Sequence, residues 1–234
     1  MAIPLRGIQK TTLLDFPGYV ACTVFTGGCN FRCPFCHNAS LLHGNDGMKE
    51  EALSEEAFFA FLSKRRGILD GVCVTGGEPL LHPELPAFLA EIKAMGFLVK
   101  LDTNGSNPQG LCRLMDASLV DYVAMDIKNS PAKYAETAGV DENILPKIRE
   151  SVSLLMEGKT PYEFRTTLVK GMHDEDDMRQ IGQWIQGAPR YFLQQFVDSG
   201  DVLREGLSAF SPEETRALLA IVREYLPEAQ ARGI

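Results

Sequence analysis

Three cysteines crowded into residues 27–38 constrain this chain more than any other feature of its sequence. Three residues separate Cys29 from Cys33, and two residues separate Cys33 from Cys36. At this spacing the thiolates can close on one soft metal centre. A structural zinc site or an electron-carrying cluster usually has a fourth protein ligand, and saturated ligation leaves no position for a substrate. Three thiolates therefore indicate a centre with one open coordination position.

A zinc site completed by a histidine is the alternative. His37 follows Cys36 directly, and two adjacent ligands would strain a four-coordinate shell. His43 and His82 do not stand at a usual zinc-finger spacing from the cysteines. The other cysteines are expected to be small structural residues: Cys22, Cys73 and Cys112.

Composition limits the class of protein. The chain has 234 residues, 45% of them hydrophobic, which suffices for one sizeable core, so we expect one domain over residues 1–234. A formal net charge of -8 argues against a nucleic-acid partner, because phosphate backbones favour concentrated Lys and Arg. We see neither a signal peptide nor a membrane span, and six cysteines are too few for a disulfide scaffold. We therefore expect a cytoplasmic protein.

Strand and helix patterns alternate along the chain after a lead-in over residues 1–18 that ends in a turn. Six segments have the β-branched and aromatic bias of buried strands: residues 19–26, 71–75, 97–101, 120–125, 162–169 and 190–197. Helical patterns are centred on residues 54–67, 83–95, 111–115, 143–156 and 211–225. Such alternation implies parallel strands with right-handed crossovers. Six units cannot close an eight-stranded barrel, so we expect an α/β fold, a partial (βα)6 TIM-like barrel open on one side.

Two runs of charged residues have ordinary explanations. We expect Lys64, Arg65 and Arg66 in the last turn of a helix, where they complement the helix dipole. The acidic run at residues 174–177 could attract a cation. Carboxylates are also favoured near the positive end of a helix dipole, and we therefore expect a solvated helix start there.

The cysteine motif resembles the signature of the radical S-adenosylmethionine (SAM) superfamily. In that superfamily three cysteines hold a 4Fe-4S cluster, and its open iron chelates SAM. The resemblance therefore implies that Cys29, Cys33 and Cys36 are cluster ligands. It extends to the aromatic residue before the third cysteine, Phe35, and implies that this residue lies at the cofactor site. His37, followed by Asn38, is similar to the ending common among activating enzymes for glycyl-radical proteins, and we place it at the same site.

Later motifs fall at the ends of expected strands, where barrel enzymes place their chemistry. Gly76, Gly77 and Glu78, followed by proline, resemble the motif whose carbonyls and carboxylate would bind the SAM ammonium. Arg165 resembles an arginine that faces the active site and could neutralise a carboxylate or anchor a peptide carbonyl. Where the family's sixth strand often ends in a histidine that contacts SAM, this chain has two glutamines, and Gln194 is our candidate replacement.

Two residue pairs resemble pairs in pyruvate formate-lyase activating enzyme. There the pair matched by Asp102 and Thr103, with the aspartate matched by Asp126 and a backbone carbonyl, helps to hold a monovalent cation. The lysine matched by Lys128 meets the SAM carboxylate. Without the resemblance, Asp102 and Thr103 would be interpreted as part of a turn, and Asp126 and Lys128 as a surface ion pair.

The resemblance covers nearly the whole chain and implies an oxidoreductase that cleaves SAM reductively. The resulting 5′-deoxyadenosyl radical would generate a glycyl radical on a partner enzyme, an anaerobic ribonucleoside-triphosphate reductase or a pyruvate formate-lyase-like enzyme. A flavodoxin or ferredoxin-type protein would donate the electron.

Two other functions stay open at this point. One is a synthase of the 7-carboxy-7-deazaguanine type, acting on a small pterin-like substrate. Those enzymes typically follow the third cysteine with Asp-Thr, whereas this chain has His37 and Asn38. The other is a zinc or electron-transfer module, which would need a fourth ligand and would not bind SAM.

Overall fold

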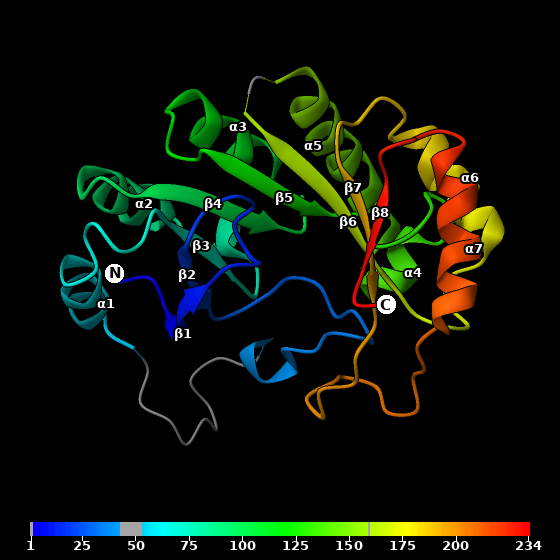
Figure 1. Cartoon of the computed structure of the whole chain (residues 1–234), viewed down its shortest axis with the longest axis horizontal. Coiled ribbons are helices and arrows are strands. Elements are labelled where there is room, and N and C mark those ends of the chain that lie inside the picture. Colours follow the sequence, from blue (N-terminus) through cyan, green and yellow to red (C-terminus); the bar gives the residue numbers. More distant parts are fainter. Residues whose placement is uncertain (1, 43–52, 159) are drawn as a thin grey trace. The chain divides into compact units, whose positions relative to one another are not determined.

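A computed structural model of the chain describes residues 2–42, 53–158 and 160–234 (Figure 1). The chain divides into two compact units, each of which is described by itself. The first unit comprises Met1–Asn30, Ser40–Thr103 and Gln109–Val123, and the second comprises Phe31–Ala39, Asn104–Pro108 and Ala124–Ile234. One domain over residues 1–234 stays a prediction.

The first unit is built on four strands. β2 (Ala21–Thr26) pairs in parallel with β3 (Gly71–Gly76), which pairs in parallel with β4 (Leu98–Thr103). β1 (Leu5–Thr12) pairs antiparallel with β2. Neighbours in this part of the sheet are also neighbours in the chain. The near-continuous burial of β2 and β3 is typical of parallel strands covered on both faces.

The lead-in predicted for residues 1–18 is wrong in part, because it contains β1. This strand has no run of apolar residues, and most of its residues are half-buried or exposed, so its sequence lacks a strand signal. Pairing with β2 supplies its hydrogen bonds instead. The predicted turn connects the two strands, and Phe16 in that turn packs on Ala21 and Tyr122.

In the described part of this unit the strands are accompanied by α1 (Glu55–Ser63), α2 (Leu85–Ala94) and α3 (Pro108–Asp116). Ser54 caps α1 by accepting a hydrogen bond from the Ala57 N–H. Phe58 of α1 stacks on Phe88 of α2, with ring centroids 5.3 Å apart, so aromatic packing joins the two helices.

The basic run at residues 64–66 lies beyond α1, and its predicted placement in the last helical turn is wrong. The helix ends at Ser63, and the Lys64 N–H donates to the Phe61 carbonyl in a tight turn. The Arg65 guanidinium lies over the Phe61 ring, 5.3 Å from its centroid. The run is therefore held by this turn and by a cation–π contact.

The second unit continues the alternation. β5 (Tyr122–Asp126) enters it at Ala124. β6 (Tyr162–Leu168) pairs in parallel with β7 (Tyr191–Gln195), and β7 pairs in parallel with β8 (Gln230–Arg232). The six predicted strands, β2 to β7, are thus confirmed, and parallel pairing joins β2 to β3, β3 to β4 and β6 to β7, whereas β8 was not expected.

β8 is short, and side-chain contacts hold it in place. Its last residue, Arg232, donates two hydrogen bonds of 3.0 and 3.1 Å to the buried carboxylate of Glu163. The same guanidinium lies over the Phe192 ring, 3.3 Å from its centroid. Three residues are too few for a recognisable periodicity, which is why the sequence did not reveal this strand.

The helices of the second unit, over its described residues, include α4 (Tyr134–Ala138), α5 (Leu145–Glu157), α6 (Glu175–Trp184) and α7 (Pro212–Arg223). α6 and α7 lie side by side (Figure 1). The acidic run lies at the start of α6 as predicted, where Asp174 and Asp177 form a capping box. The expected solvation holds only in part, because the Asp177 carboxylate is buried. Lys133 pairs with both of these carboxylates at 2.7 Å.

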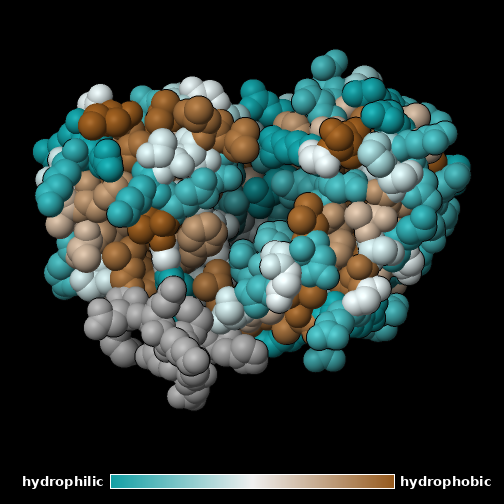
Figure 2. All heavy atoms as spheres, turned by 60° about the horizontal axis from the view of Figure 1, so that its bottom comes forward, coloured by the Kyte–Doolittle hydropathy of each residue, from teal (hydrophilic) through white to brown (hydrophobic). Residues whose placement is uncertain are grey.

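On the face drawn in Figure 2, hydrophobic residues occur in small groups among hydrophilic ones. No helix within residues 2–42, 53–158 and 160–234 is both long and apolar enough to cross a lipid bilayer.

Candidate functional site

Among the described residues, the three motif cysteines are not joined in disulfides. Cys33 is buried and Cys36 half-buried, and the Cys36 N–H donates to the Cys33 carbonyl at 3.0 Å, so one turn carries both residues. Cys29 is half-buried and belongs to the first unit, in the loop that leaves β2. Reduced thiols of this kind fit a soft iron centre. Convergence of all three on one cluster stays a prediction.

The end of α4 fixes the cysteine loop in the second unit. The Arg32 N–H donates to the Ala138 carbonyl at 2.9 Å, and the Cys33 sulfur lies 3.8 Å from the same oxygen. Gly139 follows with a φ of 64°, and a Cβ there would lie 2.4 Å from the Arg32 carbonyl oxygen. Only glycine therefore allows α4 to end this close to the loop.

A segment after β7 also holds this loop. The Arg204 N–H donates to the Pro34 carbonyl at 3.0 Å, and the Ser199 hydroxyl donates to the His37 carbonyl at 3.2 Å. The His37 residue itself is exposed. Sequence reasoning missed these contacts, because loop residues without a motif give no signal.

The glycine motif packs against the cysteine loop within the first unit. The Gly77 N–H donates to the Thr26 carbonyl at 2.9 Å, and the Glu78 N–H donates to the Gly28 carbonyl at 2.8 Å. A Cβ on Gly77 would lie 1.8 Å from the Gly28 oxygen, which no side chain can tolerate. The motif thus fixes the backbone next to Cys29.

The structure brings Glu78 and Thr103, two predicted SAM-site residues, together. The Glu78 carboxylate is 1% exposed, and its Oε1 accepts hydrogen bonds from the Thr103 hydroxyl at 2.8 Å and the Leu80 N–H at 3.1 Å. Glu78 also caps the short helix η2 (Pro79–Leu81). These bonds give the carboxylate one orientation at the end of β3, where it can receive an ammonium group.

His82, considered as a zinc ligand, has another partner. Its Nε2 lies 2.9 Å from the Gly27 carbonyl oxygen, so it anchors the start of the cysteine loop. His43, the other histidine considered, lies outside the described residues.

Asp102 has a neighbour that sequence reasoning missed. The Lys100 ammonium contacts its Oδ1, and Lys100 is only 1% exposed. Cys73 lies beside them, with its sulfur 3.7 Å from Asp102 Oδ1 and 3.9 Å from Lys100 Nζ. A lysine inside a strand belongs to no motif, so only the fold reveals this pair.

In the second unit the Asp126 carboxylate contacts two cationic side chains that were predicted to lie at the site, those of Lys128 and Arg165. Its Oδ1 accepts a hydrogen bond from Arg165 Nε at 2.9 Å, and its Oδ2 accepts one from Lys128 Nζ at 2.9 Å. Burial alone would raise the pKa of Asp126, but the charges of Arg165 and Lys128 hold that pKa well below its usual range. Burial would lower the pKa of Lys128, which Asp126 and Cys33 instead raise. Two cations share one anion, so the group can accept a further carboxylate.

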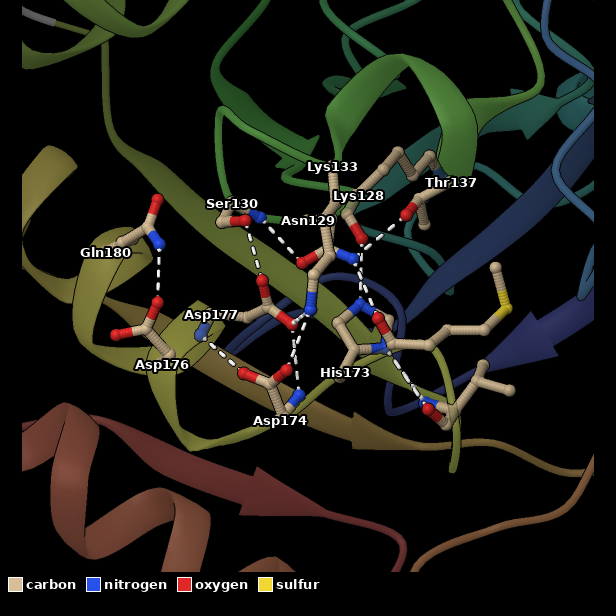
Figure 3. Close-up of polar contacts among 12 residues, drawn as sticks. Lys128, Asn129, Ser130, Lys133, Thr137, His173, Asp174, Asp176, Asp177 and Gln180 are labelled. Atoms are coloured by element: carbon tan, nitrogen blue, oxygen red, sulfur yellow. Dashed lines mark hydrogen bonds and ion pairs between the residues drawn. The ribbon is translucent and has the colours of Figure 1, made fainter.

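His173 supports the Lys128 backbone, as Figure 3 shows. Its Nε2–H donates to the Lys128 carbonyl at 2.9 Å, and its Nδ1 accepts from the Val169 N–H at 3.2 Å. The Phe35 ring meets its imidazole edge to face, with centroids 6.5 Å apart. Burial lowers the pKa of His173, so the neutral ring is favoured. This histidine, which the sequence did not single out, joins the loops after β5 and β6 to Phe35.

The Asn129 side chain also holds the loop after β5, next to Lys128. Its amide donates to the Thr137 hydroxyl at 2.9 Å and to the Met172 carbonyl at 3.0 Å (Figure 3). The loop after β5 is therefore held at two successive residues, Lys128 and Asn129.

The two glutamines at the end of β7 differ in their contacts. The Gln195 amide donates to the Phe210 carbonyl, and its oxygen accepts from the Thr215 hydroxyl at the start of α7. These hydrogen bonds direct the Gln195 side chain toward the start of α7. Gln194 stays the candidate for a SAM contact.

Comparisons with known proteins agree with the motifs. The family model described as the radical SAM superfamily matches residues 23–181. A protein of Methanocaldococcus jannaschii, whose name assigns it provisionally to the glycyl-radical enzyme activating enzymes, is 32% identical, over 98% of this chain and 96% of its own. The pyruvate formate-lyase-activating enzyme of Staphylococcus epidermidis is 28% identical, over 77% of this chain and 74% of its own.

A solved structure supports the fold. Streptococcus suis SuiB bound to precursor peptide SuiA aligns with a TM-score of 0.70 at 13% identity. The alignment covers 88% of this chain and 47% of SuiB, so the chain spans about half of that protein. The α/β fold with a parallel sheet, of the partial-barrel type, is thus confirmed. With a family model that matches more than half of its residues, this chain belongs to the radical SAM superfamily.

Proposed function

We propose that this chain activates a glycyl-radical enzyme by cleaving SAM and generating a glycyl radical on that partner. The observation that carries the proposal is the 32% identity to an activating-enzyme relative over 98% of this chain and 96% of that protein. The partner would be an anaerobic ribonucleoside-triphosphate reductase or a pyruvate formate-lyase-like enzyme.

The cysteine motif would hold the cluster through Cys29, Cys33 and Cys36. A 4Fe-4S cluster, when bound, supplies the electron that cleaves SAM. Flavodoxin or ferredoxin would deliver that electron to the protein. His173 and the end of α4 would keep the cysteine loop in one conformation, as their contacts with Phe35 and Arg32 indicate.

The strand ends would orient SAM. Glu78, held by Thr103, would accept the SAM ammonium together with the carbonyls of Gly76 and Gly77. Lys128 would meet the SAM carboxylate, since its group with Asp126 and Arg165 carries excess positive charge. Positioning of this kind, together with exclusion of water, is what the protein contributes to radical chemistry.

Arg165 would also face the partner's peptide, where its guanidinium could bind a carbonyl near the reacting glycine. The glycine must come within contact of the 5′ carbon of SAM, so the partner has to open locally.

The test is electron paramagnetic resonance on an anaerobic mixture of the iron-loaded protein, SAM, a reductant and, in turn, an anaerobic ribonucleoside-triphosphate reductase or a pyruvate formate-lyase as the partner. The proposal expects a persistent organic radical on the partner and consumption of SAM. If no radical forms on the partner while a pterin-like substrate turns over, the small-molecule synthase is the better assignment.

A further inference from the structure

We infer that Lys100 supplies, from within the protein, the positive charge that a bound monovalent cation would supply at Asp102. The chain would then bind SAM without such a cation. This inference rests on the SAM site proposed above, and it concerns how that site is neutralised.

The geometry of β4 places the two groups together. Side chains two residues apart in a strand point to the same face, so Lys100 and Asp102 share one face of β4. The Lys100 ammonium contacts Asp102 Oδ1, and the two side chains are 1% and 14% exposed. Cys73, the register partner of Lys100 on β3, lines the same spot.

Burial explains why this lysine matters. A buried ammonium is costly unless it is paired, so Lys100 needs the Asp102 carboxylate in the folded protein. The carboxylate in turn already has a positive partner at contact distance. A sodium or potassium ion at Asp102 would stand beside a fixed positive charge and be repelled, and repulsion is strong where water is excluded.

The second residue of the expected cation pair is also directed to the protein. The Thr103 hydroxyl donates to Glu78 Oε1 at 2.8 Å, which orients it toward the carboxylate that would bind the SAM ammonium. Because the Lys100 ammonium already neutralises Asp102, the residues present do not fit the cation that Asp102 and Thr103 suggest by resemblance. They fit a site in which Lys100 holds Asp102, and Thr103 holds Glu78.

The first experiment needs no variant. Calorimetry would measure SAM binding to the anaerobically iron-loaded protein in chloride salts of sodium, potassium and tetramethylammonium, the last being too large for a cation site. If Lys100 supplies this charge, the dissociation constants of SAM in the three salts should agree within about twofold. A gain in affinity of about tenfold with sodium or potassium would overturn the inference.

A pair of substitutions sharpens the test. Lys100→Met should weaken SAM binding in tetramethylammonium by about tenfold or more and recover with sodium or potassium, because Asp102 then lacks its internal partner. Lys93→Met is the matched control, since it removes the more exposed 2.6 Å pair with Asp121 in the same unit. The control should bind SAM like the unmodified protein in all three salts.

The possible negative results contradict different claims. A Lys100→Met protein that binds SAM equally in all three salts, or whose lost affinity no cation restores, contradicts the role of Lys100. If that variant does not fold, the salt comparison on the unmodified protein decides. Absence of SAM binding in every salt would refute the proposed SAM site itself, and SAM binding without a partner radical would refute only the activase function.

Discussion

Lys128, just after β5, and Arg165, in the middle of β6, both contact one carboxylate, that of Asp126. The sequence motif predicted the aspartate and the lysine, and the resemblance predicted the arginine separately. Their joint contact could not be predicted, because it depends on the registry of β5 and β6. The supporting residues Lys100 and His173 were missed for a related reason: each acts through a neighbour that only the fold provides.

Lys128→Ala should weaken SAM binding while sparing the cluster spectrum. Losing a charge-assisted hydrogen bond commonly costs about 1.5–3 kcal/mol, or about ten- to a hundredfold in affinity. Lys133→Ala is the control, since this lysine pairs instead with Asp174 and Asp177 at the start of α6. Unchanged SAM affinity of Lys128→Ala by calorimetry would contradict the assigned role.

His173 should make stability depend on pH. Its pKa is lowered in the folded protein from the ordinary 6.5, so the unfolded chain takes up a proton first as the pH falls. The stabilisation is therefore complete above the unfolded pKa and is lost as the pH falls toward the folded pKa. His173→Gln should lose stability at neutral pH and show a shallower decline below it in denaturant unfolding. An equally steep decline in both proteins would show that another group titrates.

Among the helices and strands, the sequence predicted those elements that have a clear hydrophobic pattern. β2 to β7 each have a buried apolar core of several residues, and the helix starts at Ser54, Asp174 and Ser211 carry side-chain caps. β1 and β8 were not predicted, because β1 is largely polar and β8 has only three residues. Both depend on pairing with a neighbour, a tertiary effect that overrides local propensity.

Arg232→Met should loosen β8. The substitution leaves the Glu163 carboxylate, 1% exposed, without its bidentate partner, which should lower the free energy of unfolding by about 1–3 kcal/mol. Arg179→Met breaks an exposed pair with Glu175 on α6 and should cost under about 0.5 kcal/mol. Equal effects of the two substitutions in chemical denaturation would contradict the importance of the β8 contact.

The whole molecule combines a cysteine motif with polar residues near the strand ends, and a relative matches it over nearly its full length. The formal net charge of -8 agrees with a protein partner and not with nucleic acid. The family and the α/β fold could be read from the sequence, since both follow from ordered motifs and alternation. The identity of the partner could not, because no segment of this chain encodes it.

The cluster assignment makes a prediction for the whole protein. Cys33→Ala should lose its iron after anaerobic reconstitution, because two thiolates cannot retain a cluster against solvent. Cys112→Ala is the control, since this thiol lies in α3 next to Asp116. Iron and sulfide analysis checks both, and full occupancy in Cys33→Ala would refute the ligand assignment.

The most direct test of the central claim is isotope transfer from the partner. The partner enzyme would be prepared with glycine deuterated at Cα and incubated anaerobically with the iron-loaded protein, SAM and a reductant. We expect deuterium in the 5′-deoxyadenosine product, detected by mass spectrometry, and a radical doublet on the partner that changes with the label. Unlabelled 5′-deoxyadenosine with no radical on the partner would contradict it.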